Sequence, residues 1–204
     1  MRPFLAFLLL APSAALARCP TADDISNGIV YANTLKGSES INVAYGTTAY
    51  LASYYELGDY GLTKTFLMLK GVYPLSLTAI TSDPLLTVSY HYAVPQSAFP
   101  EPAPGVNWQV EAVLARGDDT VKEVQTYTFG AEEERSIGGC DVLVLPYDIA
   151  TESEMFGTQT LEMLYFPVLG LAFPDVRRGL AEGDLPDFTE KMTTYPDLLA
   201  EWGN

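Results

Sequence analysis

The chain has 204 residues, of which 48% are apolar, and a formal net charge of -15 at pH 7. This length suits one domain with a real core, and this apolar content excludes wholesale disorder. The charge argues against nucleic-acid binding and against docking on anionic lipid, since both need a basic surface. Solubility alone explains the excess of acids, and a basic partner or divalent cations are the alternative.

The first 17 residues have the three parts of a secretory signal peptide. Arg2 supplies the positive start, residues 4–11 form an apolar run, and Ala15-Leu16-Ala17 is an Ala-x-Ala cleavage site. The run is shorter than the roughly 20 residues that span a bilayer. We predict cleavage between Ala17 and Arg18, a mature chain with no transmembrane segment, and a periplasmic location, with secretion as the alternative.

The two cysteines are predicted to form a disulfide. Cys19 lies just after the predicted cleavage site, and Cys140 is the other cysteine. Two cysteines in an exported chain pair most simply with each other. A lipid anchor on Cys19 is an alternative, but lipidated cysteines follow a small residue and here Arg18 precedes. Zinc needs about four ligands, whereas the sequence holds one histidine and no Cys-x-x-Cys.

After Cys19 the chain alternates strand-like segments with turn residues. Tyr, Thr, Val, Phe and Leu dominate the segments, and the turn signals are spaced as in antiparallel meanders, sandwiches and barrels. Strands are predicted at residues 29–35, 41–45, 48–56, 62–70, 75–81, 86–93, 108–115, 121–129, 142–149 and 159–166. The fold class is therefore all-β, a single antiparallel β-sandwich or curved open barrel over residues 18–173.

Two segments depart from this pattern. Residues 95–105 hold four prolines and are predicted to form a loop between strands, with a recognition loop that exposes Phe99 as the alternative. Residues 174–204 form an acidic C-terminal tail interrupted by glycine and proline. Short helical turns are expected at 176–181, 188–192 and 197–202, together with partial disorder at the end.

No catalytic, cofactor-binding or metal signature emerges, and we predict no cofactor. His91, the single histidine, lies in a strand-like segment and is expected to face solvent rather than to join a catalytic triad. Asp118-Asp119 is interpreted as a hairpin turn and Glu132-Glu133-Glu134 as an exposed edge or loop, although acids from distant strands can pair in glycosidases. Gly138-Gly139 is expected to supply backbone freedom for the turn before the second cysteine.

Tyrosine is unusually frequent, with 13 residues. Such rings line sugar-binding surfaces and apolar cavities, but tyrosine is also a good residue for half-buried strand positions. Strand packing explains the early cluster, and a ligand cavity is the alternative. The cluster comprises Tyr45, Tyr50, Tyr54, Tyr55 and Tyr60.

Three segments of the second half, with the early Cys19-Pro20, carry a resemblance. They are Thr126-Tyr127-Thr128-Phe129-Gly130, Ile137-Gly138-Gly139-Cys140-Asp141-Val142 and Leu164-Tyr165-Phe166-Pro167-Val168-Leu169-Gly170-Leu171. The chain resembles a group of uncharacterised exported β-rich proteins of alphaproteobacteria, in which a GGC strand precedes a YFP-x-LG strand and turn. The last segment is also similar to periplasmic β domains that close on a Y-x-P-x-x-G segment. The resemblance implies export and β architecture and brings no catalytic residues.

These features together predict a non-enzymatic envelope protein that acts by binding. A curved sheet with an apolar concave face would hold a lipid or another apolar ligand. The second hypothesis is a protein–protein interaction module of the cell envelope, acting through the tail or the proline-rich loop, and the third is a carboxylate-based hydrolase. An internal apolar cavity favours the first, an exposed patch over a filled core the second, and two buried acids in a cleft the third.

Overall fold

The computed structural model describes residues 18–36, 38–46, 51–58, 61–80 and 86–202. The predicted signal peptide, residues 1–17 with Ala17 at its end, lies outside them. The strands are β1 Ile29–Leu35, β2 Ser38–Gly46, β3 Leu51–Gly58, β4 Gly61–Leu69, β5 Tyr73–Ala79, β6 Leu86–Tyr92, β7 Asn107–Arg116, β8 Asp119–Phe129, β9 Glu133–Ile137, β10 Cys140–Ser153, β11 Gly157–Phe166, β12 Leu171–Pro174 and β13 Phe188–Thr194. The helical segments are η1 Ala22–Asn27, η2 Gln96–Ala98, η3 Val176–Gly179, η4 Glu182–Asp187 and α1 Tyr195–Trp202.

Nearly all strands join in one antiparallel sheet. Its order is β12-β11-β10-β8-β7-β6-β5-β4-β3-β2-β1-β13, while β9 lies off this path and pairs with the first part of β10. Most neighbours are consecutive in sequence, as hairpins require. The all-β prediction is confirmed, in the form of a curved open barrel rather than a sandwich.

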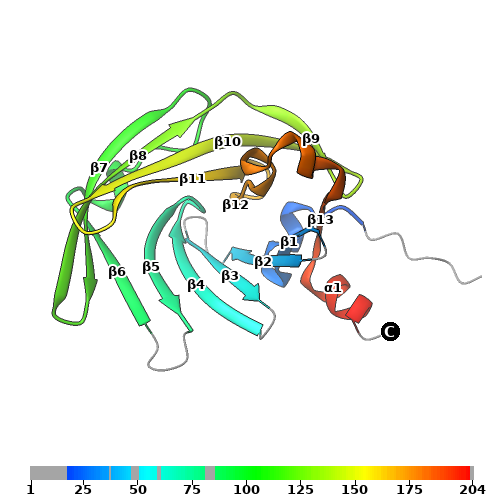
Figure 1. Cartoon of the computed structure of the whole chain (residues 1–204), viewed down its shortest axis with the longest axis horizontal. Coiled ribbons are helices and arrows are strands. Elements are labelled where there is room, and N and C mark those ends of the chain that lie inside the picture. The colour runs from blue at the N-terminus through cyan, green and yellow to red at the C-terminus, as the bar shows by residue number, and fades with distance from the viewer. Residues whose placement is uncertain (1–17, 37, 47–50, 59–60, 81–85, 203–204) are drawn as a thin grey trace, which may run out of the picture.

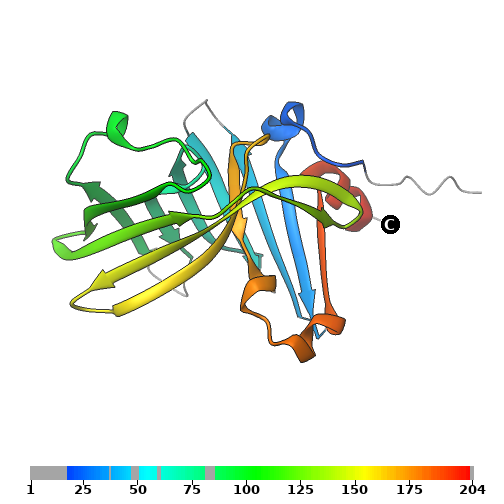
Figure 2. The ribbon, with the colours of Figure 1, turned by 90° about the horizontal axis from the view of Figure 1, so that it is seen from above.

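The sheet curls back on itself to form two walls (Figure 1). Strands β7, β8, β10, β11 and β12 form the upper wall, and β1 to β6 form the lower wall. Seen from above, the strands of the upper wall run across those of the lower wall (Figure 2). The inner face of the sheet therefore lies between the two walls.

All ten predicted strands have a counterpart, but three strands were missed: β9, β12 and β13. For β13 the prediction was wrong, because a helical turn was expected at 188–192. Phe188–Thr194 instead pairs with β1 along its whole length, Ile29 with Thr194 to Leu35 with Phe188. This pairing satisfies the backbone groups of β1, which would otherwise be exposed at an edge. The helical turns expected at 176–181 and 197–202 have counterparts in η3 and α1, and the expected partial disorder at the end stays a prediction.

Three apolar clusters hold the curl together. The first joins β1 and β13 to β11 and β12, with Tyr31 stacked on Phe173 at 5.5 Å between ring centroids. The second, called here the aromatic cluster, lies between β5, β7, β8 and β10 and includes Tyr73, Phe99, Trp108, Tyr127 and Tyr147. The third packs Leu198 of α1 on the outer face of β1 and β2.

One end of the space between the walls is closed by the proline-rich loop. Phe99 is 2% exposed and packs on Tyr73 and Trp108, at 5.0 and 4.7 Å between centroids. Lys70 Nζ donates to the Phe99 carbonyl at 2.8 Å, and the Tyr73 hydroxyl donates to the Pro100 carbonyl at 3.0 Å. The prediction of a loop is confirmed. The alternative of an exposed Phe99 is wrong, because this ring is buried and fills the closed end.

The turn between β4 and β5 meets the turn between β11 and β12 near this closed end. A Cβ on Gly71 would lie 2.1 Å from the carbonyl oxygen of Gly170, so only glycine permits this approach. Gly71 also has φ +68, which L side chains rarely adopt. The two walls are therefore in backbone contact here, and access to the inner face must come from elsewhere.

Candidate ligand groove

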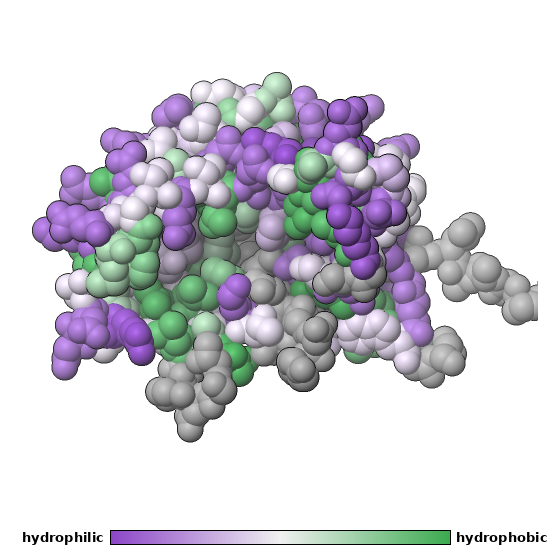
Figure 3. Space-filling model, viewed as in Figure 1, coloured by the Kyte–Doolittle hydropathy of each residue, from purple (hydrophilic) through white to green (hydrophobic). Residues whose placement is uncertain are grey.

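A groove with a cavity volume of about 1440 Å³ lies at the other end of the sheet. This end is formed by the start of β8, the end of β10, the start of β11 and neighbouring parts of β6 and β7. The lining alternates between residues of one face of the sheet, such as Tyr92, Ala112 and Glu123, and their neighbours on the other face, such as His91, Glu111, Val113, Lys122, Val124 and Glu152. Figure 3 shows apolar side chains gathered in the hollow between the upper wall and β5 and β6.

The strand register places one row of these residues on the same face. Tyr92 pairs with Ala112, Ala112 with Glu123, Glu123 with Ser153, and Ser153 with Gly157. Paired residues of adjacent antiparallel strands point to the same side of the sheet. The row therefore crosses β6, β7, β8, β10 and β11 on the inner face, at the mouth of the groove.

A hydrogen-bonded polar cluster interrupts this apolar face. The Gln125 side-chain amide donates to Glu123 Oε1, and the Tyr127 hydroxyl donates to Gln125 Oε1 at 2.7 Å. The Tyr92 hydroxyl lies 2.7 Å from the Pro74 carbonyl oxygen and 3.2 Å from Gln125 Oε1. Gln125 is 2% exposed and Glu123 is 9% exposed. The cluster runs from the aromatic cluster at Tyr127 to the groove at Glu123.

Burial raises the pKa values of the carboxyl and phenol groups in and beside this cluster. Desolvation raises the pKa of the Glu123 carboxyl above its usual value, and the hydrogen bond from Gln125 works in the opposite direction. Burial raises the pKa of Tyr127 well above 10 and that of Tyr90 to about 12, where the Glu123 charge adds to the effect. Burial likewise raises the pKa of Tyr92. Near neutral pH these phenols are neutral hydrogen-bond donors.

Half-buried apolar side chains surround the polar cluster on the inner face. In the next row toward the mouth, Tyr90 pairs with Leu114 and Leu114 with Val121. On β5 and β6, Leu77 pairs with Val88. All five side chains are only partly covered by the rest of the chain. The inner face at this end is thus largely apolar and only partly covered, with the polar cluster beside these side chains.

The β10–β11 hairpin overhangs the groove. Ser153 Oγ accepts hydrogen bonds from the backbone N–H groups of Met155 and Phe156, both at 3.1 Å, and so orders the hairpin tip. Met155 is 66% and Phe156 58% exposed, although both are large and apolar. Leu161, which pairs with buried Ile149, is 56% exposed. The rim of the groove is therefore apolar on this side.

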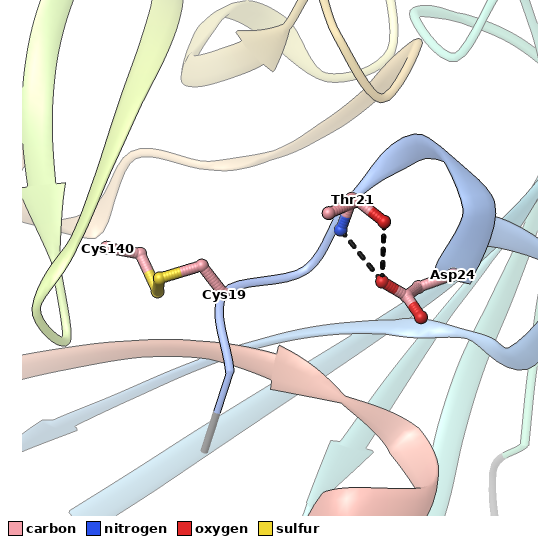
Figure 4. The surroundings of a disulfide bond; sticks show 4 residues. All are labelled: Cys19, Thr21, Asp24 and Cys140. Carbon is pink, nitrogen blue, oxygen red and sulfur yellow. Dashed lines mark hydrogen bonds between the residues drawn. A yellow bond between two sulfur atoms is a disulfide. The ribbon is translucent and has the colours of Figure 1, made fainter. Parts of the chain in front are cut away.

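The predicted disulfide is present and lies away from the groove. Cys19 and Cys140 have Cα atoms 5.5 Å apart and are 121 residues apart in sequence (Figure 4). Gly138 and Gly139 have φ +58 and +83 and make the turn from β9 to Cys140, as expected. A Cβ on Gly138 would lie 3.0 Å from the Lys191 Cα of β13. The bond thus fastens the segment before β1 to a turn that rests on β13.

The segment after Cys19 is held by the Asp24 carboxylate. The Thr21 backbone N–H and hydroxyl donate to Asp24 Oδ2 at 2.9 and 2.8 Å (Figure 4), and the Arg18 guanidinium pairs with Oδ1. The backbone hydrogen bond from Thr21 is the largest cause that lowers the pKa of Asp24, against the effect of burial. Arg18, the first residue after the predicted cleavage site, thus has a contact in the folded domain.

A second polar cluster joins the two ends of the sheet. Arg135 of β9 donates to Asp175, which follows β12, at 3.0 and 3.3 Å. The Tyr31 hydroxyl of β1 donates to Glu190 of β13 at 2.8 Å, and Arg177 lies 3.5 Å from Glu190. The Asp175 side chain is fully buried and that of Arg135 is 12% exposed. Because every charge in this cluster has a partner, it serves to close the curl.

The residues singled out from the sequence do not form a site. His91 is exposed on β6, as expected, and is one of the residues that line the groove. Asp118 lies in the β7–β8 turn and Asp119 begins β8, so the hairpin interpretation is confirmed. Residues 132–134 are exposed at or beside β9, also as expected. Tyr50 and Tyr60 of the early cluster lie outside the described residues.

Sequence reasoning missed Glu123 and Gln125. A signal was present, because alternation from Val121 to Phe129 places both residues in phase with Tyr127 and Phe129, which are buried. Two polar residues in phase with a buried aromatic pair mark a polar interruption of an inner face.

Among the described residues, no group of three or more His, Cys, Asp and Glu side chains is arranged to hold a metal ion. Within the same part of the chain, the structure has no helix with the length and apolar character to cross a membrane.

No protein-family model matches the chain, and no curated protein has a significantly similar sequence. Among solved structures, the chain is similar to the hypothetical lipoprotein YmcC from Escherichia coli (K12), with a TM-score of 0.44 and 11% sequence identity. The match covers 83% of this chain and 87% of that chain. A likeness at this level carries no argument about function.

Proposed function

We propose that this protein is an exported, non-enzymatic binding protein that holds an apolar or amphiphilic ligand between the two walls of its curled sheet. One observation carries the proposal: at the end away from Phe99, the inner face presents half-buried apolar side chains, among them Tyr90, Leu114 and Val121. Ligand sites are concave, largely apolar and preformed, with a few placed polar groups. The inner face at this end is concave (Figure 1) and largely apolar, and Glu123 and Gln125 are its buried polar groups.

The two ends of the inner face differ in packing, which argues that this face does more than form a hydrophobic core. Phe99 and the Gly71–Gly170 contact fill one end, so the aromatic cluster there is packed. From Tyr127 toward Val121, the inner face of β8 passes from buried to partly exposed. A chain that needed only a stable core would extend the packing of the closed end along the whole sheet.

The disulfide supports the proposed location. Such bonds persist in oxidising compartments such as the bacterial periplasm and are rare in the cytosol. Cys19 and Cys140 are the only cysteines of the chain, and both are used. A periplasmic site of action would also place the groove next to the lipids of the envelope.

One feature supports the second hypothesis, a protein–protein interaction module of the cell envelope. The loop and tail that suggested it are packed into the domain through Phe99, Met192 and Leu198. Met155 and Phe156 at the tip of the β10–β11 hairpin remain exposed, and large exposed apolar residues often mark contact sites. Because this tip forms part of the groove rim, we treat it as part of the ligand site.

The test is to express the chain with its own signal, purify it from the periplasm and record its native mass. Extra mass that organic solvent removes would support ligand carriage. Val121→Trp places an indole in the groove and should lower occupancy, whereas Thr128→Trp, at an exposed position on the outer face of the same strand, should not. A bare chain that also fails to bind an apolar fluorescent probe would refute the proposal.

A further inference from the structure

One edge of the large sheet is open along the first half of β11. Residues 157–165 of this strand pair with β10, whereas β12 pairs only with residues 163–166 on the other side. On that side, residues 157–161 have no neighbouring strand among the described residues, and all five are exposed. In Figure 2 this half of β11, in yellow, lies at the outer margin of the upper wall.

Two threonines direct their backbone groups out of this edge. The Asp175 N–H donates to the Glu162 carbonyl at 2.9 Å, so Glu162 points its backbone groups toward the open side. Every second residue of an antiparallel strand points its N–H and C=O groups in the same direction. Thr158 and Thr160 therefore direct four backbone groups outward, and these groups have no partner in the described part of the chain.

The open segment lacks the features that usually protect an edge strand. Proteins prevent edge-to-edge pairing with charged side chains, with proline or with a bulge. Residues 157–161 are Gly-Thr-Gln-Thr-Leu, without charge or proline, and their pairing with β10 has no register shift. By contrast, β9 and β13, which also lie at margins of the sheet, carry charges: Arg135 and two glutamates in β9, and Glu190 and Lys191 in β13.

The open segment is complementary to itself. When a two-fold axis passes beside Gln159, Thr158 of one copy lies opposite Thr160 of the other, and all four outward groups of each copy are paired. Two cross-strand threonine pairs then form on one face, and such pairs stabilise a β ladder. On the other face, Leu161, which is 56% exposed, lies opposite Gly157 of the other copy, which has no side chain to clash with it.

Repulsion between the acidic copies is limited at this edge. Asp148 and Glu162, the acids beside the open segment, lie 2.9 and 3.8 Å from the Arg178 guanidinium. Glu152 pairs with Thr158 in the ladder, so its two copies would stand three strand spacings apart, about 14 Å. This separation exceeds the Debye length of about 8 Å at physiological salt. The ladder itself brings no like charges together.

We infer that two copies of this chain associate through the open edge of β11, so that one antiparallel sheet runs through both molecules. The ladder is short, because Asp175 already occupies the Glu162 carbonyl. The dimer is therefore weak, with a dissociation constant on the order of 10 to 100 µM, as for small transient interfaces. This association is independent of the proposed ligand.

Analytical ultracentrifugation of the mature protein measures the association. The wild type should pass from monomer to dimer between about 1 µM and about 1 mM, and the dimer should tighten severalfold from about 0.05 to about 0.5 M salt, because each copy has a net negative charge. Thr160→Pro removes an outward N–H without removing a hydrogen bond to β10, and should weaken the dimer at least about tenfold. Thr160→Ala removes the same side chain but keeps the N–H, and should change the affinity by less than about threefold. Circular dichroism checks the fold of both variants.

A cross-link tests the register and does not depend on the proline variant. The two-fold axis brings the two Gln159 Cα atoms to about 4.5 Å, a spacing that a disulfide can bridge. Gln159→Cys should therefore form a covalent dimer under mild oxidation, whereas Thr128→Cys, at an exposed position on the outer face of β8, should not. A wild type that stays monomeric at every concentration would overturn the proposal and leave the edge to a strand of a different protein. A dimer that survives Thr160→Pro and gives no cross-link through Gln159→Cys would overturn the assignment to β11.

Discussion

The Cys19–Cys140 disulfide should carry a large share of the stability of the domain. It closes a loop whose ends are 121 residues apart in sequence, and the chain-entropy model assigns such a loop roughly 5 kcal/mol at 25 °C. Domains of this size unfold with about 5 to 15 kcal/mol. The double substitution Cys19→Ser/Cys140→Ser is therefore expected to cost about 3 to 5 kcal/mol, the range typical for a lost native disulfide.

The structure gives a reason to expect the upper part of this range. The bond fastens the chain before β1 to the β9–β10 turn, which rests on β13 through Gly138 and Lys191. Without it, the curl depends on the cluster between β1 and β12 and on the pairing of Arg135 with Asp175. Neither restricts the unfolded chain.

Urea unfolding followed by the fluorescence of Trp108, which lies in the aromatic cluster, measures the loss. At a slope of about 2 kcal/mol/M, the midpoint should fall by about 2 M. Reduced wild type is the control and should match the double variant, since both lack the same constraint. A loss below about 1 kcal/mol would show that the bond does not restrain the unfolded chain, and the argument from loop length would fail.

Two substitutions and one change of pH test the packing. Tyr147→Phe removes a buried hydroxyl that has no partner among the described residues, so stability to urea should rise by about 1 kcal/mol; a decrease would contradict this. Asp175→Ala leaves the buried Arg135 guanidinium without its main partner and should cost about 3 to 5 kcal/mol in the same assay, whereas a loss under about 1 kcal/mol would refute the closing role. Burial raises the pKa of Tyr90 to about 12, so its neutral form is favoured in the fold and this stability is intact below pH 10, where the unfolded phenol begins to ionise. The urea midpoint should fall as pH rises from 10 toward 12, with tyrosinate absorbance appearing on unfolding, and a constant midpoint would contradict the assignment.

Most strands could be predicted because their turn residues and their alternation of side chains are visible within short stretches of sequence. Gly117 and Asp118, for example, make a two-residue turn between β7 and β8, and the alternation on each side shows the flanking strands. The segment that forms β13 has no such signal. It holds one acid and one base, Glu190 and Lys191, follows two helical turns and becomes a strand because β1, more than 150 residues earlier, offers a free edge. Pairing of this kind depends on tertiary structure, which the strand propensity of a single segment does not predict.

The candidate groove was predictable as a class of surface but not in its residues. A curved sheet with an apolar concave face follows from strand composition, whereas the position of the opening depends on which end is filled. Phe99 decides this, and nothing in the proline-rich segment 95–105 shows that its one aromatic ring turns inward. The exposure of Leu161 has a similar origin, because it requires knowing that β12 is short and leaves the first half of β11 unpaired on that side.

The two polar clusters of the inner face differ in a way that separates structure from function. Around Asp175, a buried charge meets an oppositely charged Arg135, and the cluster is complete within the chain. Around Glu123, the carboxyl accepts a hydrogen bond from the Gln125 amide and has no described cation as its partner, and burial raises its pKa. A fold under selection for stability alone would replace such a residue by an apolar one, because its neighbours Val121 and Tyr127 are apolar on the same face. Places where a sequence breaks its own local pattern at a cost are where function is expected. The unmatched acid, and not the matched pair, is therefore the residue that points to a ligand.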